Sequence, residues 1–185
     1  MRIESTKLDG CFIIHDTFFG DSRGYFFESF NKKTFFDKTG LEVEFVQDNQ
    51  SQSQLGVLRG LHFQHGDAAQ AKLVRVLKGK VLDIAVDLRA HSATFGQHVA
   101  VELSEDSRTQ FFVPRGFAHG FVVLSEQATF FYKCDNYYNK SAEGGIIYND
   151  PEIGIDWKIE TDNIIISDKD LILPRLSEIK KDLQF

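Results

Sequence analysis

Apolar and polar residues alternate with a period of two along most of the chain, which is the pattern of strands that bury one face. In the segment 80–88, leucine, isoleucine and valine occupy every second position, while Asp83 and Asp87 lie between them. This predicts a half-buried strand with the aspartates on its polar face. Gly79, between two lysines, predicts a tight turn that joins this strand in a hairpin to another at 72–77.

Further segments with the composition of strands follow at the short intervals typical of a β-sandwich or barrel. They cover residues 12–15, 25–30, 45–51, 56–63, 98–103, 110–113, 117–124 and 128–132. Helix is scarce: Asn31 is placed to cap a short helix that ends at Gly40, and a second is expected from Ser177 toward Asp182. No linker or internal repeat interrupts the pattern, so we expect one all-β domain over residues 1–185.

The composition is that of a soluble globular domain, with 42% apolar and 26% charged residues among 185. A net charge of −6 argues against a nucleic-acid partner, so an anionic ligand would need a local cluster of arginine and lysine. Cys11 and Cys134 are too few for a disulfide framework and fit a reducing cytoplasm. The first residues carry charges, and no run of about 18 apolar residues occurs, so neither a signal peptide nor a membrane span is expected.

The run Arg59-Gly60-Leu61-His62 places a cation and a titratable imidazole three positions apart in an apolar strand. Strand alternation points such positions to opposite faces. Arg59 and His62 can share a site only if Gly60 allows a bulge or a twist. The alternative is a surface arginine and a hydrogen-bonded core histidine, and the spacing alone leaves both open.

The run Pro114-Arg115-Gly116-Phe117-Ala118-His119 resembles the second half of the metal-binding signature of cupins. The first half of that signature needs His-x-His followed by a glutamate. His62 and His65 lack this spacing, and Lys72 follows them, where an ammonium would repel a divalent cation. We therefore expect no functional metal.

Other polar side chains within strand patterns have two interpretations each. Lys72 is in phase with apolar neighbours; a snorkelling surface lysine is the simpler interpretation, but in a pocket it would stabilise an oxyanion or hold a phosphate. Tyr132 and Tyr138 pack at a sheet rim, or serve as a general acid and a stacking surface. The polar run 47–49 is either exposed or serves a ligand, because buried polar groups without partners are costly.

Nine short blocks, taken together, resemble the dTDP-4-dehydrorhamnose 3,5-epimerase family. They include Asp-Ser-Arg-Gly-Tyr-Phe-Phe-Glu at 21–28, Gly-Val-Leu-Arg-Gly-Leu-His at 56–62 and Pro-Arg-Gly-Phe-Ala-His-Gly-Phe at 114–121, with others at 47–49, 72–76, 83–89, 132–134, 149–151 and 167–170. Each block alone is weak evidence for the family, but the whole set in this order, from about residue 20 to 176, is strong evidence. The resemblance implies a cupin jelly roll with a few short helices, no metal or organic cofactor, and a homodimer whose strands cross between subunits.

The substrate that the resemblance implies is dTDP-4-dehydro-6-deoxy-D-glucose, whose C4 ketone acidifies the hydrogens on C3 and C5. Inverting these carbons needs a base, a cation at the enolate oxygen, and an acid on the opposite face of the ring. By resemblance, His62 is the base and Asp170 the carboxylate that supports it. Lys72 then stabilises the enolate, and Tyr132 is the acid.

The resemblance also assigns substrate-binding positions. Arg23, Arg59 and Lys169 match groups that hold the diphosphate or sugar, Phe26 and Tyr138 match aromatics that sandwich the thymine, and the further positions are Glu28, Gln47, Asp48, Asn49, His119 and Glu143. The stretch 23–28 is expected to reach across the dimer into the neighbouring site.

Other functions remain open from the sequence. One is a relative that inverts only C3 or moves the ketone between C3 and C4. Departures such as Gln50 and Phe63, where the family usually has histidine and tyrosine, leave the exact sugar undetermined. The others are a non-catalytic cupin that binds sugar nucleotides and a metal-dependent cupin oxygenase.

Overall fold

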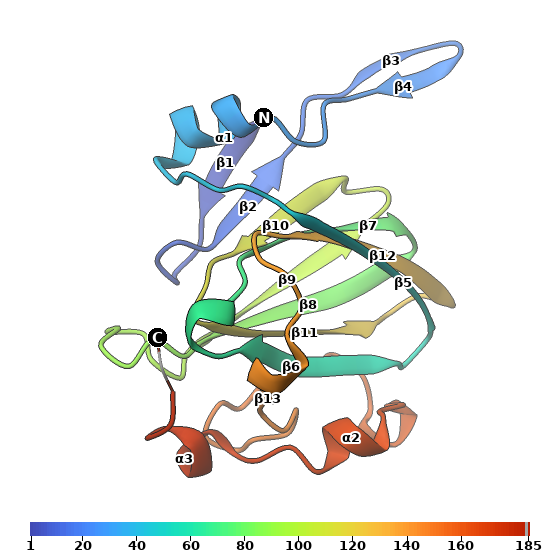
Figure 1. Cartoon of the computed structure of the whole chain (residues 1–185). Coiled ribbons are helices and arrows are strands. Elements are labelled where there is room, and N and C mark those ends of the chain that lie inside the picture. The colour runs from blue at the N-terminus through green and yellow to red at the C-terminus, as the bar shows by residue number, and fades with distance from the viewer. Residues whose placement is uncertain (184) are drawn as a thin grey trace.

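The computed structural model describes residues 1–183 and 185, and two antiparallel sheets dominate it (Figure 1). The larger sheet has the strand order β1 (Arg2–Ser5), β2 (Phe12–His15), β10 (Thr109–Val113), β7 (Lys72–Lys78), β12 (Gln127–Cys134) and β5 (Gln47–Gln54). The smaller has the order β13 (Glu143–Gly145), β6 (Leu58–Gln64), β11 (Phe117–Val123), β8 (Lys80–Asp87) and β9 (His98–Ser104). Two facing sheets whose neighbours are distant in sequence form a jelly roll, which confirms the predicted all-β class.

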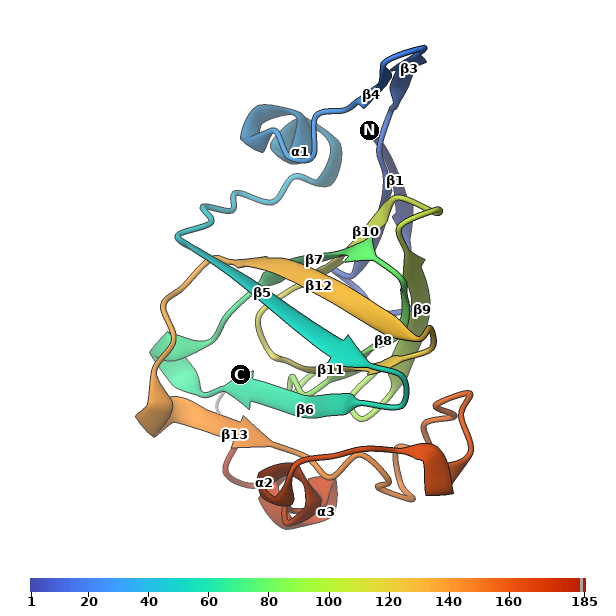
Figure 2. The same cartoon turned by 90° about the vertical axis from the view of Figure 1, so that its right-hand side faces the viewer.

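The two sheets enclose the main core of the protein. The side chains that fill it are buried and apolar and come from both sheets: Val74, Val76, Phe111, Val113 and Phe130 from the larger, and Val81, Ala85, Leu103, Phe117, Phe121 and Val123 from the smaller. Figure 2 shows the sheets curling toward each other around this interior. Strand alternation therefore points every second side chain into the barrel, where a polar side chain can contact a ligand.

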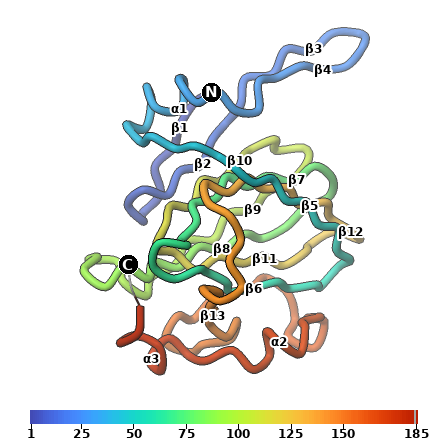
Figure 3. Tube along the Cα trace, in the orientation of Figure 1, coloured from blue at the N-terminus to red at the C-terminus, as the bar shows by residue number. Residues whose placement is uncertain are grey.

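The strand β8 is buried on both faces, so the predicted half-buried strand is wrong. Its apolar row packs outward under the C-terminal segment, against Ile153, Trp157 and Leu176. The other row, with Asp83, faces the barrel interior, and neither Asp83 nor Asp87 has any exposed surface. The C-terminal segment thus covers the apolar face of β8 (Figure 3), while the face that the local pattern marks as solvent-exposed lies against the barrel interior.

The predicted hairpin between residues 72–77 and 80–88 is also wrong. β7 pairs with β10 and β12, and β8 pairs with β11 and β9, so the turn at Gly79 carries the chain from one sheet to the other. The turn itself is correctly predicted: Gly79 has a φ of 79°, and a Cβ there would lie 2.0 Å from the carbonyl oxygen of Gln127. The turn type does not reveal which sheet the next strand joins.

The helices are short. In α1 (Lys32–Thr39), Asn31 caps the first turn by accepting from Thr34 N at 3.0 Å, and Gly40 ends the helix in the left-handed region, as predicted. Near the C-terminus are α2 (Asp168–Leu171) and α3 (Leu176–Ile179), the latter ending sooner than expected. Single 3₁₀ turns lie at Gly66–Ala68, Lys140–Ala142 and Thr161–Asn163. Within the described residues, none of the helices is long and apolar enough to cross a membrane.

A two-stranded ribbon, β3 (Phe19–Asp21) and β4 (Gly24–Phe26), projects away from the barrel (Figures 1 and 2). We call residues 17–28 the arm. The predicted strand at 25–30 is wrong beyond Phe26, because β3 offers only three residues for pairing before the chain turns toward α1.

The segment that precedes α2 lies along β6. Ile165 pairs with Val57 in a parallel bridge, and its carbonyl oxygen accepts from Leu58 N at 2.8 Å. The segment then turns at Ser167, whose hydroxyl caps α2 by accepting from Asp170 N at 3.2 Å. This backbone pairing brings Asp170 next to a strand more than 100 positions earlier in the chain.

Candidate active site

The barrel opens into a cavity of about 540 Å³ beside β6, β11, β12 and the segment before α2. Its walls carry many of the side chains proposed from the sequence: Arg59, His62, Lys72, His119, Tyr132, Lys169 and Asp170. An adjoining cavity of about 170 Å³ shares His62, Lys72 and Tyr132 with the first and adds Gln47, Asn49, Tyr138 and Glu143. The two form the halves of one site.

His62 and Asp170 form a close pair at the junction of these halves. The imidazole Nε2 lies 2.8 Å from Asp170 Oδ1, and 31% of the His62 side chain is exposed, against 6% for Asp170. Burial alone would raise the pKa of the Asp170 carboxyl, but hydrogen bonds and charge from His62 and the backbone N–H of Gly60 outweigh it and lower that pKa. An ionised Asp170 fixes the ring orientation and directs Nδ1, as a proton acceptor, away from the carboxylate.

A bulge in β6 turns Arg59 and His62 to the same face. Arg59 lies opposite Phe121 and His62 opposite His119, so two residues of β6 face a single residue of β11 between these pairs. His119 and Phe121 are two positions apart on a regular strand, and both line the cavity. Their partners on β6, His62 and Arg59, therefore face the cavity as well. Gly60, within the bulge, has a φ of 129°. The distortion that a shared site requires is therefore present.

Lys72 extends into the cavity, so its interpretation as a surface lysine is wrong. Burial lowers the pKa of its ammonium, while the nearby charges of Asp83 and Glu143 act in the opposite direction. The Lys72 Nζ lies 6.0 Å from the centre of the Tyr132 ring. Burial also raises the pKa of Tyr132, so its hydroxyl stays protonated and can donate a proton.

Asp83, which the sequence patterns did not single out, makes a second histidine–aspartate pair on the cavity floor. His119 Nε2 lies 2.9 Å from Asp83 Oδ1 and 3.1 Å from Oδ2. Burial raises the pKa of the Asp83 carboxyl, and the neighbouring His119 and Lys72 oppose that rise. A signal was available: Asp83 alternates with Val81 and Ala85, and an aspartate in an apolar row needs a buried partner.

The cavity entrance carries further charged groups. Glu143 accepts from Lys169 at 2.7 Å and from the Tyr138 hydroxyl at 3.2 Å, and Arg59 Nε donates to Ser53 Oγ at 3.1 Å. With Lys72, this makes three cationic side chains around the site of an acidic protein. Such a local cluster attracts an anionic ligand against the overall charge.

Four of the proposed binding residues lie outside the cavities of their own chain. The Arg23 side chain is 87% exposed on the arm and pairs with Asp21, and Phe26 is 71% exposed. Glu28, at the base of the arm, accepts from Asn31 at 3.2 Å. Asp48 points to the outer face of its sheet, where it accepts from Lys133 at 2.9 Å. Alternation along β5 sends Asp48 outward because its neighbours Gln47 and Asn49 line the cavity.

The arrangement can take a proton from carbon, hold an oxyanion and return a proton from another direction. Among residues 1–183 and 185, no cluster of three or more histidine, cysteine, aspartate or glutamate side chains is arranged to hold a metal ion. The barrel and its cavity thus define a cupin-type protein with the groups of a proton-transfer enzyme.

Comparison with known proteins specifies the family. The family model for dTDP-4-dehydrorhamnose 3,5-epimerase matches residues 5–178. The enzyme of that name from Salmonella typhimurium is 54% identical over 157 residues, covering 85% of this chain and 86% of its own. The crystal structure of the dTDP-4-dehydrorhamnose 3,5-epimerase from Elizabethkingia anophelis is 55% identical with a TM-score of 0.94, covering 96% of this chain and 97% of its own. That of a dTDP-6-deoxy-D-glucose-3,5-epimerase from Legionella pneumophila, in complex with dTDP-4-keto-L-rhamnose, is 46% identical with a TM-score of 0.94, covering 100% and 98%. The chain belongs to the dTDP-4-dehydrorhamnose 3,5-epimerase family.

Proposed function

We propose that this protein inverts C3 and C5 of dTDP-4-dehydro-6-deoxy-D-glucose to give dTDP-4-dehydro-L-rhamnose, within the cytoplasmic synthesis of dTDP-rhamnose for surface polysaccharides. One observation carries the proposal: the His62–Asp170 pair, the Lys72 ammonium and the Tyr132 hydroxyl surround one cavity. The Legionella relative was solved with dTDP-4-keto-L-rhamnose, the product of this reaction.

The reaction follows from the positions of these groups. His62 removes a proton from the carbon beside the ketone, and Asp170 stabilises the resulting imidazolium. The electron pair moves to the C4 oxygen, where Lys72 offsets the negative charge of the enolate. Tyr132 returns a proton to the opposite face of the carbon, which inverts it. His62 then releases its proton to water and Tyr132 regains one from water, so that the cycle can repeat at the second carbon.

Binding of the nucleotide uses the charged entrance. Arg59 and Lys169 neutralise the diphosphate, and Tyr138 supplies a face for the thymine. Gln47 and Asn49 offer amides for hydrogen bonds. No step of this mechanism calls for a metal or an organic cofactor, and one domain supplies all of these groups.

The arm completes the site in a homodimer. Its exposed aromatic side chains Phe19, Tyr25 and Phe26 are costly to leave in water, which indicates a surface that a second copy covers. In a dimer with exchanged arms, Arg23 and Phe26 reach the partner's cavity, where Phe26 closes the thymine site opposite Tyr138. This explains why neither residue lies in the cavity of its own chain.

The chemistry is tested by incubating the purified protein with the dTDP-4-keto sugar in D2O and following the products by NMR. We expect deuterium at C3 and at C5. Deuterium at C3 alone would replace the proposal with a C3-specific epimerase, and exchange at neither carbon would refute it. His62→Ala is the control: it should retain the nucleotide and lose exchange at both carbons, because the barrel and the cations remain.

Arm exchange is tested with mixed dimers. A chain with Arg23→Ala and Phe26→Ala is paired with a chain carrying His62→Ala, and the heterodimer is purified with two different tags. One of its two sites then combines an intact base with an intact arm, so we expect about half the activity of the wild-type dimer. If each arm served its own chain, the heterodimer would be no more active than its parents.

A further inference from the structure

The root of the arm is held by a single buried amide. Gln110, on β10, has only 3% of its surface exposed. Its Nε2 donates to Asp16 Oδ2 at 2.7 Å and to the Ser29 carbonyl oxygen at 2.6 Å. Asp16 precedes the arm and Ser29 follows it, so both protons of one amide group tie together the two chains that enter and leave the arm.

Asp16 depends on this amide. Burial raises the pKa of its carboxyl, and the hydrogen bond from Gln110 opposes that rise. The other oxygen, Asp16 Oδ1, is buried without a hydrogen-bond partner in the part of the chain that the structure describes. Loss of the Gln110 donor would leave this carboxylate without a hydrogen bond at either oxygen, at a considerable cost in free energy.

A cluster of aromatic rings from the arm lines the same small cavity as Gln110. The rings of Phe18 and Phe27 stack with their centres 4.3 Å apart, and Tyr25 meets Phe18 edge-on at 5.6 Å. The barrel holds this cluster with two cations. Arg108 lies 4.5 Å from the centre of the Phe18 ring and 4.2 Å from that of Tyr25, and Arg75 lies 5.0 Å from that of Phe27.

We infer that Gln110, Arg75 and Arg108 form a clamp that fixes the direction of the arm before ligand binds, and that Gln110 is thereby a positioning residue for the neighbouring active site. This rests on the proposed exchange of arms. Free rotation of the arm about its root would have to be frozen each time a substrate bound, which weakens binding. With the clamp, the arm is ordered when the chain folds. Arg23 and Phe26 at its far end then point toward the neighbouring active site before the substrate binds.

The test replaces the donor with an apolar, unbranched side chain. Gln110→Met keeps the length of the side chain and removes both hydrogen bonds. Gln127→Met is the matched control, because Gln127 also lies on the larger sheet but bonds to Gln52 and not to the arm. The reporter is a fluorophore at Ser22→Cys, on the exposed tip of the arm; the natural Cys11 and Cys134 are buried and stay unlabelled.

Time-resolved anisotropy of this probe measures the order of the arm without substrate. We expect one slow rotation in the unmodified background and in Gln127→Met, and a large additional fast component in Gln110→Met. In the D2O assay without the label, Gln110→Met should raise the KM about five- to tenfold and leave kcat within about twofold, because the clamp does not touch the reacting groups.

The outcomes separate the clamp from the activity. An arm that is as ordered in Gln110→Met as in the control would overturn the clamp, as would a loosened arm with an unchanged KM. A fall in kcat with an unchanged KM would show that Gln110 acts through the barrel and would overturn it too. Failure of the proposed function would instead appear as an inactive wild type, whatever the anisotropy of the variant.

Discussion

The imidazoles of His62 and His119 lie opposite each other across β6 and β11, and each is bound to a different aspartate. Asp170 belongs to the C-terminal segment at the cavity wall, whereas Asp83 is buried in the barrel floor with no exposed surface. The two pairs act differently. In the proposed mechanism the first presents a base to the ligand, and the second places a negative charge near Lys72, which raises the pKa of its ammonium.

Replacement of Asp83 tests that role. Its charge raises the pKa of Lys72, together with the charge of Glu143, against the burial that lowers it. Asp83→Asn should therefore lower the pKa of Lys72, and activity should fall at a lower pH on the alkaline side of the profile. We also expect a loss of about 10- to 100-fold in kcat/KM at neutral pH, the effect of losing a charged hydrogen-bond partner.

The measurement is kcat/KM as a function of pH at constant ionic strength. Glu102→Gln is the control, since Glu102 pairs with Lys80 on the surface of β9. An unchanged alkaline limb in Asp83→Asn would show that Asp83 serves packing alone.

For individual residues, the sequence predicted which side chains line the cavity better than it predicted their burial and their partners. His62, Lys72 and Tyr132 were found through blocks of sequence, because the chemistry of a site restricts residue type and order. Asp83 was missed because alternation within one strand suggests that its polar row is solvent-exposed, and only the packing of the other sheet over that face shows otherwise.

Among the elements, β6 is decisive for the proposed site, because its bulge brings His62 and Arg59 to one face. Gly60 occupies this bulge at a φ of 129°, and a Cβ there would lie 2.6 Å from the Cα of Gly120. The neighbouring backbone cannot move aside without breaking the pairing of β11. Both the backbone conformation and the close approach therefore require glycine.

Gly60→Ala should accordingly destabilise the protein by more than the conformational strain of about 1–3 kcal/mol. Gly24→Ala is the matched control: Gly24 has a φ of 131° but open space around the position of its Cβ. Denaturant unfolding of both variants separates strain from collision. Equal losses of unfolding free energy in the two would contradict the collision with Gly120.

The sequence located most strands but not their partners. Gly79 and its lysines predicted a turn, yet β7 and β8 belong to different sheets. A two-residue pattern defines the faces of a strand, and its neighbours are set by long-range packing that no local window contains. The bulge in β6, by contrast, could be predicted from the sequence. The Arg59–His62 spacing requires a bulge if both residues share a site, and Gly60 indicates its position.

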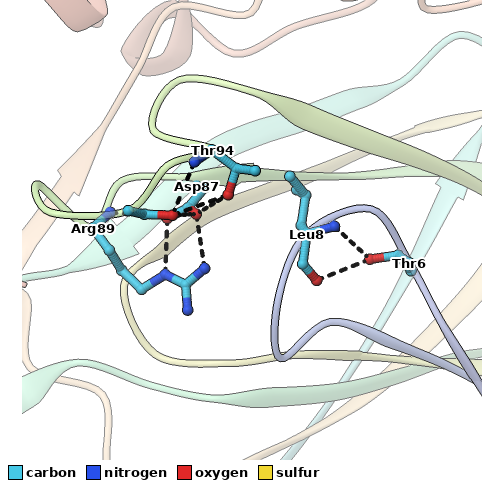
Figure 4. Close-up of polar contacts among 6 residues, drawn as sticks. Thr6, Leu8, Asp87, Arg89 and Thr94 are labelled. Carbon is cyan, nitrogen blue, oxygen red and sulfur yellow. Dashed lines mark hydrogen bonds and ion pairs between the residues drawn. The ribbon is translucent and has the colours of Figure 1, made fainter.

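For the whole molecule, one buried aspartate anchors the end of β8 against the loop that follows. Asp87 accepts from Arg89 at 2.9 Å and 2.7 Å and from the Thr94 hydroxyl at 2.7 Å (Figure 4). It also accepts from the Ser92 hydroxyl at 2.6 Å. Burial alone would raise the pKa of Asp87, but these hydrogen bonds lower it from 3.8 to about 2.

The folded pKa lies below the unfolded one, so this carboxylate stabilises the protein above about pH 4, and the contribution disappears as the pH falls through about 2. The shift corresponds to about 2 kcal/mol. We expect the difference in unfolding free energy between wild type and Asp87→Asn to shrink by about that amount between pH 5 and about pH 2. A difference independent of pH would show that Asp87 is not the group that titrates.

The extra residue in β6 also bears on how this strand tolerates the insertion or deletion of a codon. A three-base deletion that removed Gly60 would leave Arg59 and His62 two positions apart, so a regular strand opposite Phe121 and His119 would still hold both side chains on the cavity face. With Gly60 present and no bulge, a regular strand would instead turn His62 to the side of the sheet opposite Arg59. In genetic terms, the bulge absorbs one additional codon without turning over the rest of the strand.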